Sequence, residues 1–166
     1  MTARLLDVNV LVSLLDSAHI HHDAALTWFR AVAAVEGWAT CPLTENGLIR
    51  VVSHLNYPNL RLSPAYAAES LAMFKAGFPK IHQFWPDSIS LTDSALFDLA
   101  VLTGSRQTTD TYLAGLAFRN GGRLATLDGG IQWRAVRGAD AGLIERIVPL
   151  GSQTGYGSFS ATSRNL

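Results

Sequence analysis

The sequence predicts an α/β protein in which a parallel sheet of about five strands is covered by helices on both faces. Three observations support this prediction. Short apolar runs of strand length alternate with longer segments of helical periodicity, as they do in parallel sheets. A chain of 166 residues, 48% of them hydrophobic, is long enough to bury the core of one such domain. Several apolar runs also end in an acidic residue, where parallel sheets commonly place functional groups.

The first half of the chain alternates strand and helix twice. The run ARLLD ends in Asp7, and the run GWATC follows a helical segment, so both have the form of buried strands. Pro42 stands at the start of the second helical segment, where a proline is well tolerated. The predicted elements are a strand at 3–7, a helix at 24–35, a strand at 37–41 and a helix from Pro42 to Leu55.

The second half continues this alternation without a linker or an internal repeat. The predicted elements are a helix at 64–74, a strand at 81–85, a helix at 93–102 capped by Thr92, a weak strand at 105–109, a helix at 110–120, a strand at 123–128 and a last strand at 146–150. We expect residues 1–150 to form a single domain. The polar tail 151–166 is rich in Gly and Ser, and we expect it to be flexible.

The charge balance does not indicate a partner. Lys plus Arg and Asp plus Glu each number 13, so the overall field favours neither nucleic acid nor an anionic membrane. A neutral protein can still bind RNA through a local patch. Cys41 is the only cysteine, which excludes an internal disulfide and a cysteine-based zinc cage. Polar residues break the longest apolar stretches, and the start lacks a signal-peptide layout, so we expect a cytoplasmic protein without membrane spans.

Four acidic residues fall at the ends of predicted strands or just beyond them. Asp7 ends the first strand, Glu45 follows the second, Asp110 follows the weak strand 105–109, and Asp128 ends a later one. In open parallel sheets the ligand crevice lies outside the carboxyl ends of the strands. We therefore expect the four carboxylates to converge on one rim of the sheet.

Each of these acids, taken alone, has a simpler explanation. Carboxylates are favoured at helix N-caps and in first helical turns, and capping is the commoner role of one Asp at such a junction. Thr44 and Thr109, however, offer capping hydroxyls beside Glu45 and Asp110. The sequence also places no lysine close to any of the four acids, and four carboxylates without a cation would repel one another.

A divalent cation would resolve this repulsion. Mg²⁺ and Mn²⁺ prefer oxygen ligands, and Mg²⁺ commonly binds through one or two carboxylates while it keeps several waters. Such an ion activates water for attack on phosphorus and neutralises charge on the transferring phosphate. Asn9, two residues after Asp7, is placed to orient a carboxylate or a metal-bound water. The sequence leaves open whether one or two ions bind.

Four stretches carry a resemblance to a known family: LLDVNVLVSLLD, HIHHDAALTWF, CPLTENGLIRVV and TTDTYLAGLAFRNGGRLATLD. Their order and spacing over about residues 4–150 resemble the PIN-domain family, in particular the VapC-type toxins of prokaryotic toxin–antitoxin pairs. The resemblance implies a PIN-like α/β/α sandwich with a five-stranded parallel sheet, and an endoribonuclease that depends on Mg²⁺ or Mn²⁺. It also implies a homodimer and a VapB-type antitoxin whose C-terminal segment enters the active-site groove.

The resemblance assigns roles to particular residues. The family's acidic quartet falls on Asp7, Glu45, Asp110 and Asp128, which are then both catalytic and metal-binding. Asp7 and Asp110 match the metal positions most closely. Thr109 and Thr126 match small polar positions beside the acids. The chain departs from many relatives at Gly129-Gly130, where those relatives carry a further acidic or basic residue.

Other functions stay open at this point. A non-catalytic PIN module that binds antitoxin or nucleic acid, and a metal-dependent DNA nuclease, fit the same pattern. Arg50 fits a phosphate contact, a partner of an acid, or a solvated side chain. His19, His21 and His22 lack the further ligands that a zinc site needs, and the sequence assigns them no role. The RNA target and the identity of the antitoxin cannot be predicted from one sequence.

Overall fold

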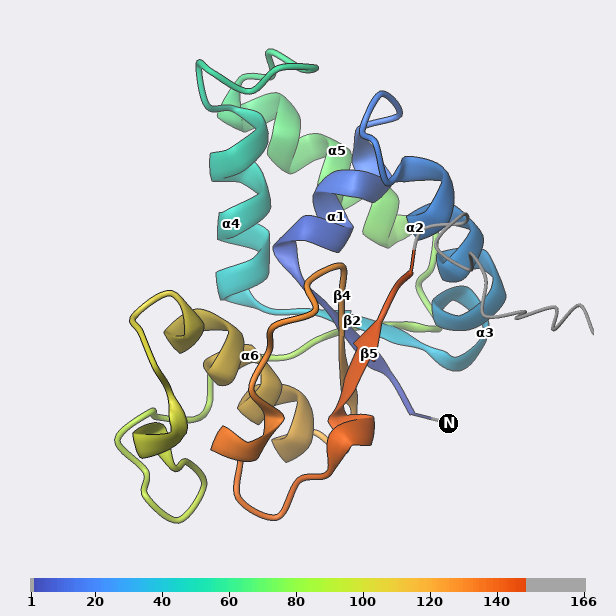
Figure 1. Ribbon diagram of the computed structural model, residues 1–166. Helices are drawn as coiled ribbons and strands as arrows, with labels where there is room; N and C mark the ends of the chain where they lie inside the picture. Colours follow the sequence, from blue (N-terminus) through green and yellow to red (C-terminus); the bar gives the residue numbers. More distant parts are fainter. Residues whose placement is uncertain (1, 149–166) are drawn as a thin grey trace, which may run out of the picture.

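The computed structural model describes residues 2–148 (Figure 1). Its strands are β1 (Arg4–Leu6), β2 (Trp38–Thr40), β3 (His82–Phe84), β4 (Arg123–Thr126) and β5 (Ile144–Arg146). Its α-helices are α1 (Val8–Leu15), α2 (His22–Trp28), α3 (Ala34–Glu36), α4 (Pro42–Val52), α5 (Pro64–Ala76) and α6 (Gln107–Arg119). A π-helical turn, η1 (Phe29–Ala33), joins α2 to α3, and three 3₁₀ turns follow at η2 (Leu99–Val101), η3 (Trp133–Ala135) and η4 (Ala141–Leu143).

The strands form one parallel sheet in the order β3-β2-β1-β4-β5. The chain moves outward from β1 to β3, and then crosses to the other side of β1 for β4 and β5. Helices α1 to α5 pack on one face of the sheet, while α6 and the loop segments before and after it cover the other (Figure 1). The prediction of an α/β/α sandwich around a parallel sheet of about five strands is confirmed.

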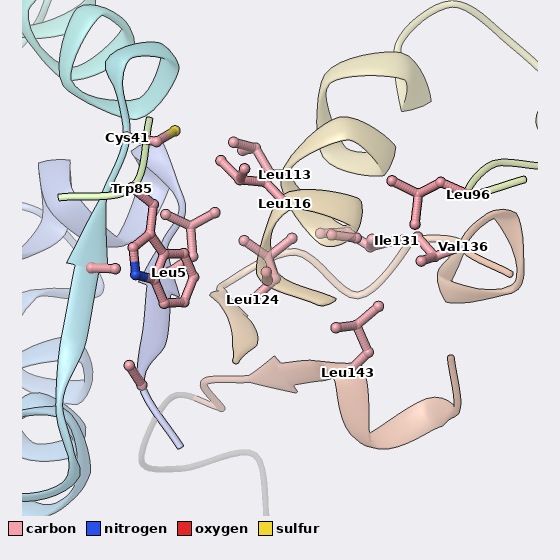
Figure 2. Packing of buried hydrophobic residues seen from close by; sticks show 14 of the residues in the cluster. Leu5, Cys41, Trp85, Leu96, Leu113, Leu116, Leu124, Ile131, Val136 and Leu143 are labelled. Atoms are coloured by element: carbon pink, nitrogen blue, oxygen red, sulfur yellow. The ribbon is translucent and has the colours of Figure 1, made fainter. Parts of the chain in front are cut away.

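The three central strands, β1, β2 and β4, each contribute to two hydrophobic layers, because successive side chains point to opposite faces of a sheet. On β1, Leu5 packs in the layer under α6, whereas Leu6 packs in the layer under α1 and α4. Leu124 and Ala125 of β4 divide in the same way. Figure 2 shows the α6 layer, with Leu5 and Leu124 beside the leucines of that helix. Burial on both faces explains why these strands read as continuous apolar runs.

Two predicted elements are wrong. Residues 93–102, predicted as a helix capped by Thr92, form turns that include only the short η2. Two carboxylates there bond to nearby backbone N–H groups, Asp93 to Ala95 at 2.9 Å and Asp98 to Ala100 at 3.3 Å, and such local bonds compete with a helix. The predicted strand 105–109 does not form either, because α6 already begins at Gln107.

Other differences concern boundaries. The apolar run after Asp7 is the helix α1, which the sequence did not predict as a separate element. The last strand lies at Ile144–Arg146, two residues earlier than predicted, and residues 149–150 of that prediction lie outside the described part of the chain. The tail 151–166 also lies outside it, so the domain boundary stays a prediction. Within residues 2–148, no helix has both the length and the apolarity needed to cross a bilayer.

One packing contact in the α6 layer gives a stability prediction. A methyl group at Gly115 of α6 would overlap the ring of Phe97, which is only 3% exposed. We expect Gly115→Ala to lower the free energy of unfolding by about 1–3 kcal/mol despite the better helix propensity of alanine. Gly104→Ala is the matched control, because nothing lies within 4 Å of its added carbon. Urea unfolding of both variants tests this, and equal stabilities would contradict it.

Candidate functional site

The candidate site lies where the strand order reverses, between β1 and β4. Asp7 comes directly after β1, and Asp128 lies two residues beyond β4. The backbone N–H of Asp7 donates to the carbonyl of Ala125 at 3.0 Å, so the ends of the two strands are held together. In open α/β sheets, the carboxyl ends of strands at such a switch point form the ligand crevice. The topology thus places Asp7 and Asp128 in the usual position of a functional site.

Asp7 has two structural partners. Its Oδ1 accepts the N–H of Val8 at 2.6 Å, so that Asp7 is the N-cap of α1. Its Oδ2 accepts the hydroxyl of Thr126 at 2.7 Å. Asp7 is only 7% exposed. Capping is therefore part of its role, but it does not explain why the carboxylate also needs a buried hydroxyl from a neighbouring strand.

Thr126 is the centre of a hydrogen-bond network that connects the two strand ends. Its fully buried hydroxyl accepts Nδ2–H of Asn9 at 3.1 Å and the N–H of Asp128 at 3.0 Å. Asn9 in turn accepts the N–H of Leu127 at 3.1 Å. Asn9, which the sequence suggested would orient a carboxylate, therefore reaches Asp7 through Thr126. This network fixes the positions of the backbone around Asp128 and of the Asp7 side chain together.

Asp110 completes a cluster of three carboxylates. It lies in the first turn of α6, so its predicted position at the start of a helix is confirmed. The strand that was predicted directly before it does not form. A cleft of about 360 Å³ opens beside it. The lining residues are Asp7, Val8, Asn9, Val12, His19, Val51, Tyr57, Asp110 and Asp128. We call this space the acidic cleft.

Burial and neighbouring negative charge raise the proton affinity of two of these carboxylates, Asp110 and Asp7. Burial, together with the charges of Asp7 and Asp128, raises the pKa of Asp110 to about 6. Burial also raises the pKa of Asp7, against the hydrogen bonds from Thr126 and Val8 that lower it. Among residues 2–148, no Lys or Arg lines the acidic cleft or forms an ion pair with any of the three. In the described part of the chain, the cluster is thus a concentration of negative charge that no lysine or arginine pairs with.

The donor set of the acidic cleft fits a hard divalent cation. Carboxylate and amide oxygens are the ligands that Mg²⁺ and Mn²⁺ prefer, and the cleft supplies them from Asp7, Asp110, Asp128 and Asn9. Within the described residues, no three acidic, His or Cys side chains meet closely enough to hold an ion by themselves. Mg²⁺ commonly binds through one or two carboxylates and keeps waters in its other positions, which suits this arrangement.

The structure directs the fourth predicted carboxylate elsewhere. Glu45, in the first turn of α4, accepts the hydroxyl of Thr40 at 2.6 Å and forms an ion pair with Lys75 of α5 at 2.7 Å. It does not line the acidic cleft. The expectation that no lysine lies near the acids is therefore wrong for Glu45. Sequence distance concealed this contact, because Lys75 lies on another helix 30 residues away.

The Glu45–Lys75 ion pair gives a second stability prediction. Both side chains are partly buried, 21% and 25% exposed, so the pair is shielded from solvent more than a surface pair is. We expect Glu45→Gln and Lys75→Met to be non-additive, with a coupling free energy of about 1 kcal/mol. Urea unfolding of the two single variants and the double variant measures this coupling. Additive effects would show that the pair contributes nothing to stability.

The remaining predicted residues lie in different places. Thr109 lies inside α6 and is exposed, so it is not the cap that the sequence suggested, because the helix begins two residues earlier. Thr44 does take part in a capping box, in which its hydroxyl accepts the N–H of Cys41 at 3.0 Å. Arg50 is exposed on α4 and lines a neighbouring hollow together with Val51 and Tyr57 of the acidic cleft.

Sequence reasoning missed two contributors to the site. His19 lines the acidic cleft, and its Nδ1 is held by the hydroxyl of Ser13 at 3.0 Å and the N–H of His21 at 3.1 Å. The His-rich stretch stands out in the sequence, but no spacing rule connects it with acids on other elements. Tyr57 also lines the cleft from the α4–α5 loop, and nothing in the local sequence marks it. Both are brought there by tertiary structure.

Comparison with known proteins identifies the family. No family model matches the sequence. Ribonuclease VapC44 of Mycobacterium tuberculosis (strain ATCC 25618 / H37Rv) is 42% identical over 135 residues, which are 81% of this chain and 92% of that protein. From the same strain, Ribonuclease VapC39 is 41% identical over 147 residues, 87% of this chain and 99% of that protein, and Ribonuclease VapC29 is 40% identical over 127 residues, 76% and 86% respectively. The resemblance drawn from the sequence is confirmed, and the chain belongs to the family of VapC ribonucleases.

Proposed function

We propose that the chain is the toxin of a toxin–antitoxin pair, an endoribonuclease that hydrolyses RNA phosphodiesters with the help of a divalent cation. The observation that carries the proposal is the cluster of Asp7, Asp110 and Asp128 around one cleft that no Lys or Arg of residues 2–148 lines. Such a cluster is electrostatically costly, and it is explained if it binds a cation that the reaction needs. The names of the relatives support RNA as the substrate.

The residues of the acidic cleft have distinct parts in this proposal. Asp7, Asp110 and Asp128 would hold Mg²⁺, with Mn²⁺ as a substitute, and the ion would supply charge neutralisation and an activated water for attack on phosphorus. Thr126 and Asn9 keep Asp7 and the Asp128 backbone in place. Glu45 stays a predicted fourth member, because its carboxylate would have to leave Lys75 before it faced the cleft.

Partners follow from the family. A VapB-type antitoxin would hold the enzyme inactive, and the exposed acidic cleft is the surface that such a partner must cover. A homodimer in the cytoplasm is the expected assembly. The order of events in a cell would then be release from the antitoxin, followed by RNA cleavage.

Cleavage of a total cellular RNA pool by antitoxin-free protein tests the proposed function. We expect the RNA to be cut with Mg²⁺ or Mn²⁺ and not with EDTA. We expect single-stranded DNA not to be cut under the same conditions. Asp140→Asn is the control for substitutions in the acidic cleft, because Asp140 is exposed and lies outside the cleft, between β4 and β5. Cutting that persists in EDTA would contradict the metal requirement, and cutting of the DNA alone would establish the alternative of a DNA nuclease.

A further inference from the structure

A hollow beside the acidic cleft is lined by a guanidinium group and by no carboxylate of the described residues. It has a volume of about 290 Å³ and lies over the end of α4 and the loop that follows. Its lining residues are Arg50, Val51, His54, Asn56, Tyr57 and Pro58, and we call it the Arg50 hollow. Val51 and Tyr57 also line the acidic cleft, so the two spaces are neighbours that share a wall.

The cationic lining continues away from the cleft. A third space of about 150 Å³ shares His54 with the Arg50 hollow and adds Arg61. No carboxylate is among the described residues that line either hollow. Neither Arg50 nor Arg61 forms an ion pair within residues 2–148. Two guanidinium groups, unpaired within the described residues, thus line the two spaces that follow one another from the acidic cleft.

The shared wall is held in place by a buried carboxylate. The hydroxyl of Tyr57 donates to Oδ2 of Asp16 at 2.7 Å, and Nδ2–H of Asn59 donates to the same atom at 2.8 Å. Asp16 is fully buried and also accepts the N–H of Ala18 at 3.0 Å. These bonds tie the loop after α4 to the end of α1. The ring of Tyr57 therefore stands at a fixed position between the two spaces.

We propose that the Arg50 hollow binds the nucleotide next to the scissile phosphate of a single-stranded RNA, with Arg50 at a backbone phosphate and Tyr57 against the base. This inference rests on the proposed function. Single-stranded RNA is recognised by unstacked bases on aromatic side chains, with guanidinium groups at the phosphates. The strand would run from the acidic cleft past Tyr57 toward His54 and Arg61. The duplex form would be excluded, since a paired base cannot turn into the hollow.

Binding of a pool of short single-stranded RNA of random sequence tests this subsite. Fluorescence anisotropy would be measured with the Asp110→Asn protein in Mg²⁺, in which cutting is expected to be lost. Adding Arg50→Gln should weaken binding several-fold and reduce the slope of log affinity against log salt by about 0.7. Adding Tyr57→Leu should weaken it on the order of tenfold. Tyr57→Phe, which keeps the ring but loses its hydroxyl bond to Asp16, should bind more tightly than Tyr57→Leu.

Two controls separate this subsite from general effects. Arg119→Gln removes an exposed guanidinium at the far end of α6, and it should leave affinity and salt slope unchanged. A duplex RNA of the same length should bind more weakly than the single strand. Circular dichroism would show that the Arg50, Tyr57 and Arg119 variants fold as the parent does.

These binding experiments test the subsite, whereas cleavage of cellular RNA tests the proposed function. Loss of affinity in Arg50→Gln and Tyr57→Leu, but not in Arg119→Gln, supports the subsite. Equally tight RNA binding by all variants would overturn the subsite, and RNA cleavage by the wild type would still support the proposed function. Unchanged RNA binding together with weaker binding of a co-expressed antitoxin would show that the hollow contacts protein instead. No binding of the RNA pool at all would also overturn it.

Discussion

Asp110→Asn is expected to abolish RNA cleavage and at the same time to stabilise the folded protein. The rate of cleavage should fall by about 10³-fold, since several kcal/mol of transition-state stabilisation depend on a cation that this carboxylate would help to hold. The free energy of unfolding in EDTA at pH 7.5 should rise by about 1–2 kcal/mol, because the substitution removes one of three repelling charges. Single-turnover cleavage and urea unfolding measure the two effects on the same preparation.

The pH dependence of this stabilisation follows from the raised pKa of Asp110. In the folded state the pKa of Asp110 is about 6, against 3.8 for an unperturbed aspartate, because of burial and the neighbouring acids. Between these values the folded wild type binds more protons than the unfolded chain, so its stability falls as the pH rises through this window. Asp110→Asn lacks the titrating carboxyl and therefore this pH-dependent loss of stability. The two proteins should therefore be similar in stability near pH 4 and differ fully above pH 7, and a constant difference would contradict this assignment.

Thr126→Val is expected to be the most destabilising single substitution in the site. Valine keeps the shape of threonine but removes the hydroxyl that donates to Asp7 and accepts from Asn9 and from the N–H of Asp128. The Asp7 carboxylate, the Asn9 amide and the N–H of Asp128 would each lose a hydrogen-bond partner, and because Thr126 is fully buried, water does not readily replace it. Each such loss costs about 1–3 kcal/mol, and partial rearrangement leaves an expected total of about 3 kcal/mol. Urea unfolding in EDTA measures it.

Thr126→Ser is the matched variant for this prediction, because it keeps the hydroxyl and loses a methyl group. Its cost should be about 1 kcal/mol, from lost packing alone. Thr126→Val should also raise the pKa of Asp7 further, since the hydrogen bond that lowers it is gone. The acidic limb of the cleavage rate against pH should then move to higher pH in this variant. Equal stabilities of the valine and serine variants would show that the network does not hold the site together.

The sheet could be predicted from the sequence because its three central strands are buried on both faces and lie between strong helical patterns. The strands around Leu5, Trp38 and Leu124 read as apolar runs for this reason. The errors fell where local hydrogen bonds decide the conformation. At Asp93 and Asp98, carboxylates bonded to nearby N–H groups favour turns over the helix that the apolar pattern suggested.

The candidate site was predictable in part. Asp7 and Asp128 follow strands that are neighbours in the sheet, so a rule about strand ends was sufficient to place them together. The pairing of Glu45 with Lys75 could not be predicted, because it depends on how α5 packs against α4. Tyr57 was missed for the same reason. Its position depends on a hydrogen bond to Asp16, far away in the sequence and fully buried.

The measurement that tests the central claim most directly is the binding of Mn²⁺ by the antitoxin-free protein, followed by its electron paramagnetic resonance signal. The claim is that Asp7, Asp110 and Asp128 form a divalent-cation site. We predict saturable binding to the wild type and to Asp140→Asn, and a loss of affinity of at least about tenfold in Asp7→Asn and in Asp110→Asn. Equal binding by all four proteins, or binding by none of them, would contradict the claim and leave the acidic cleft without its cation.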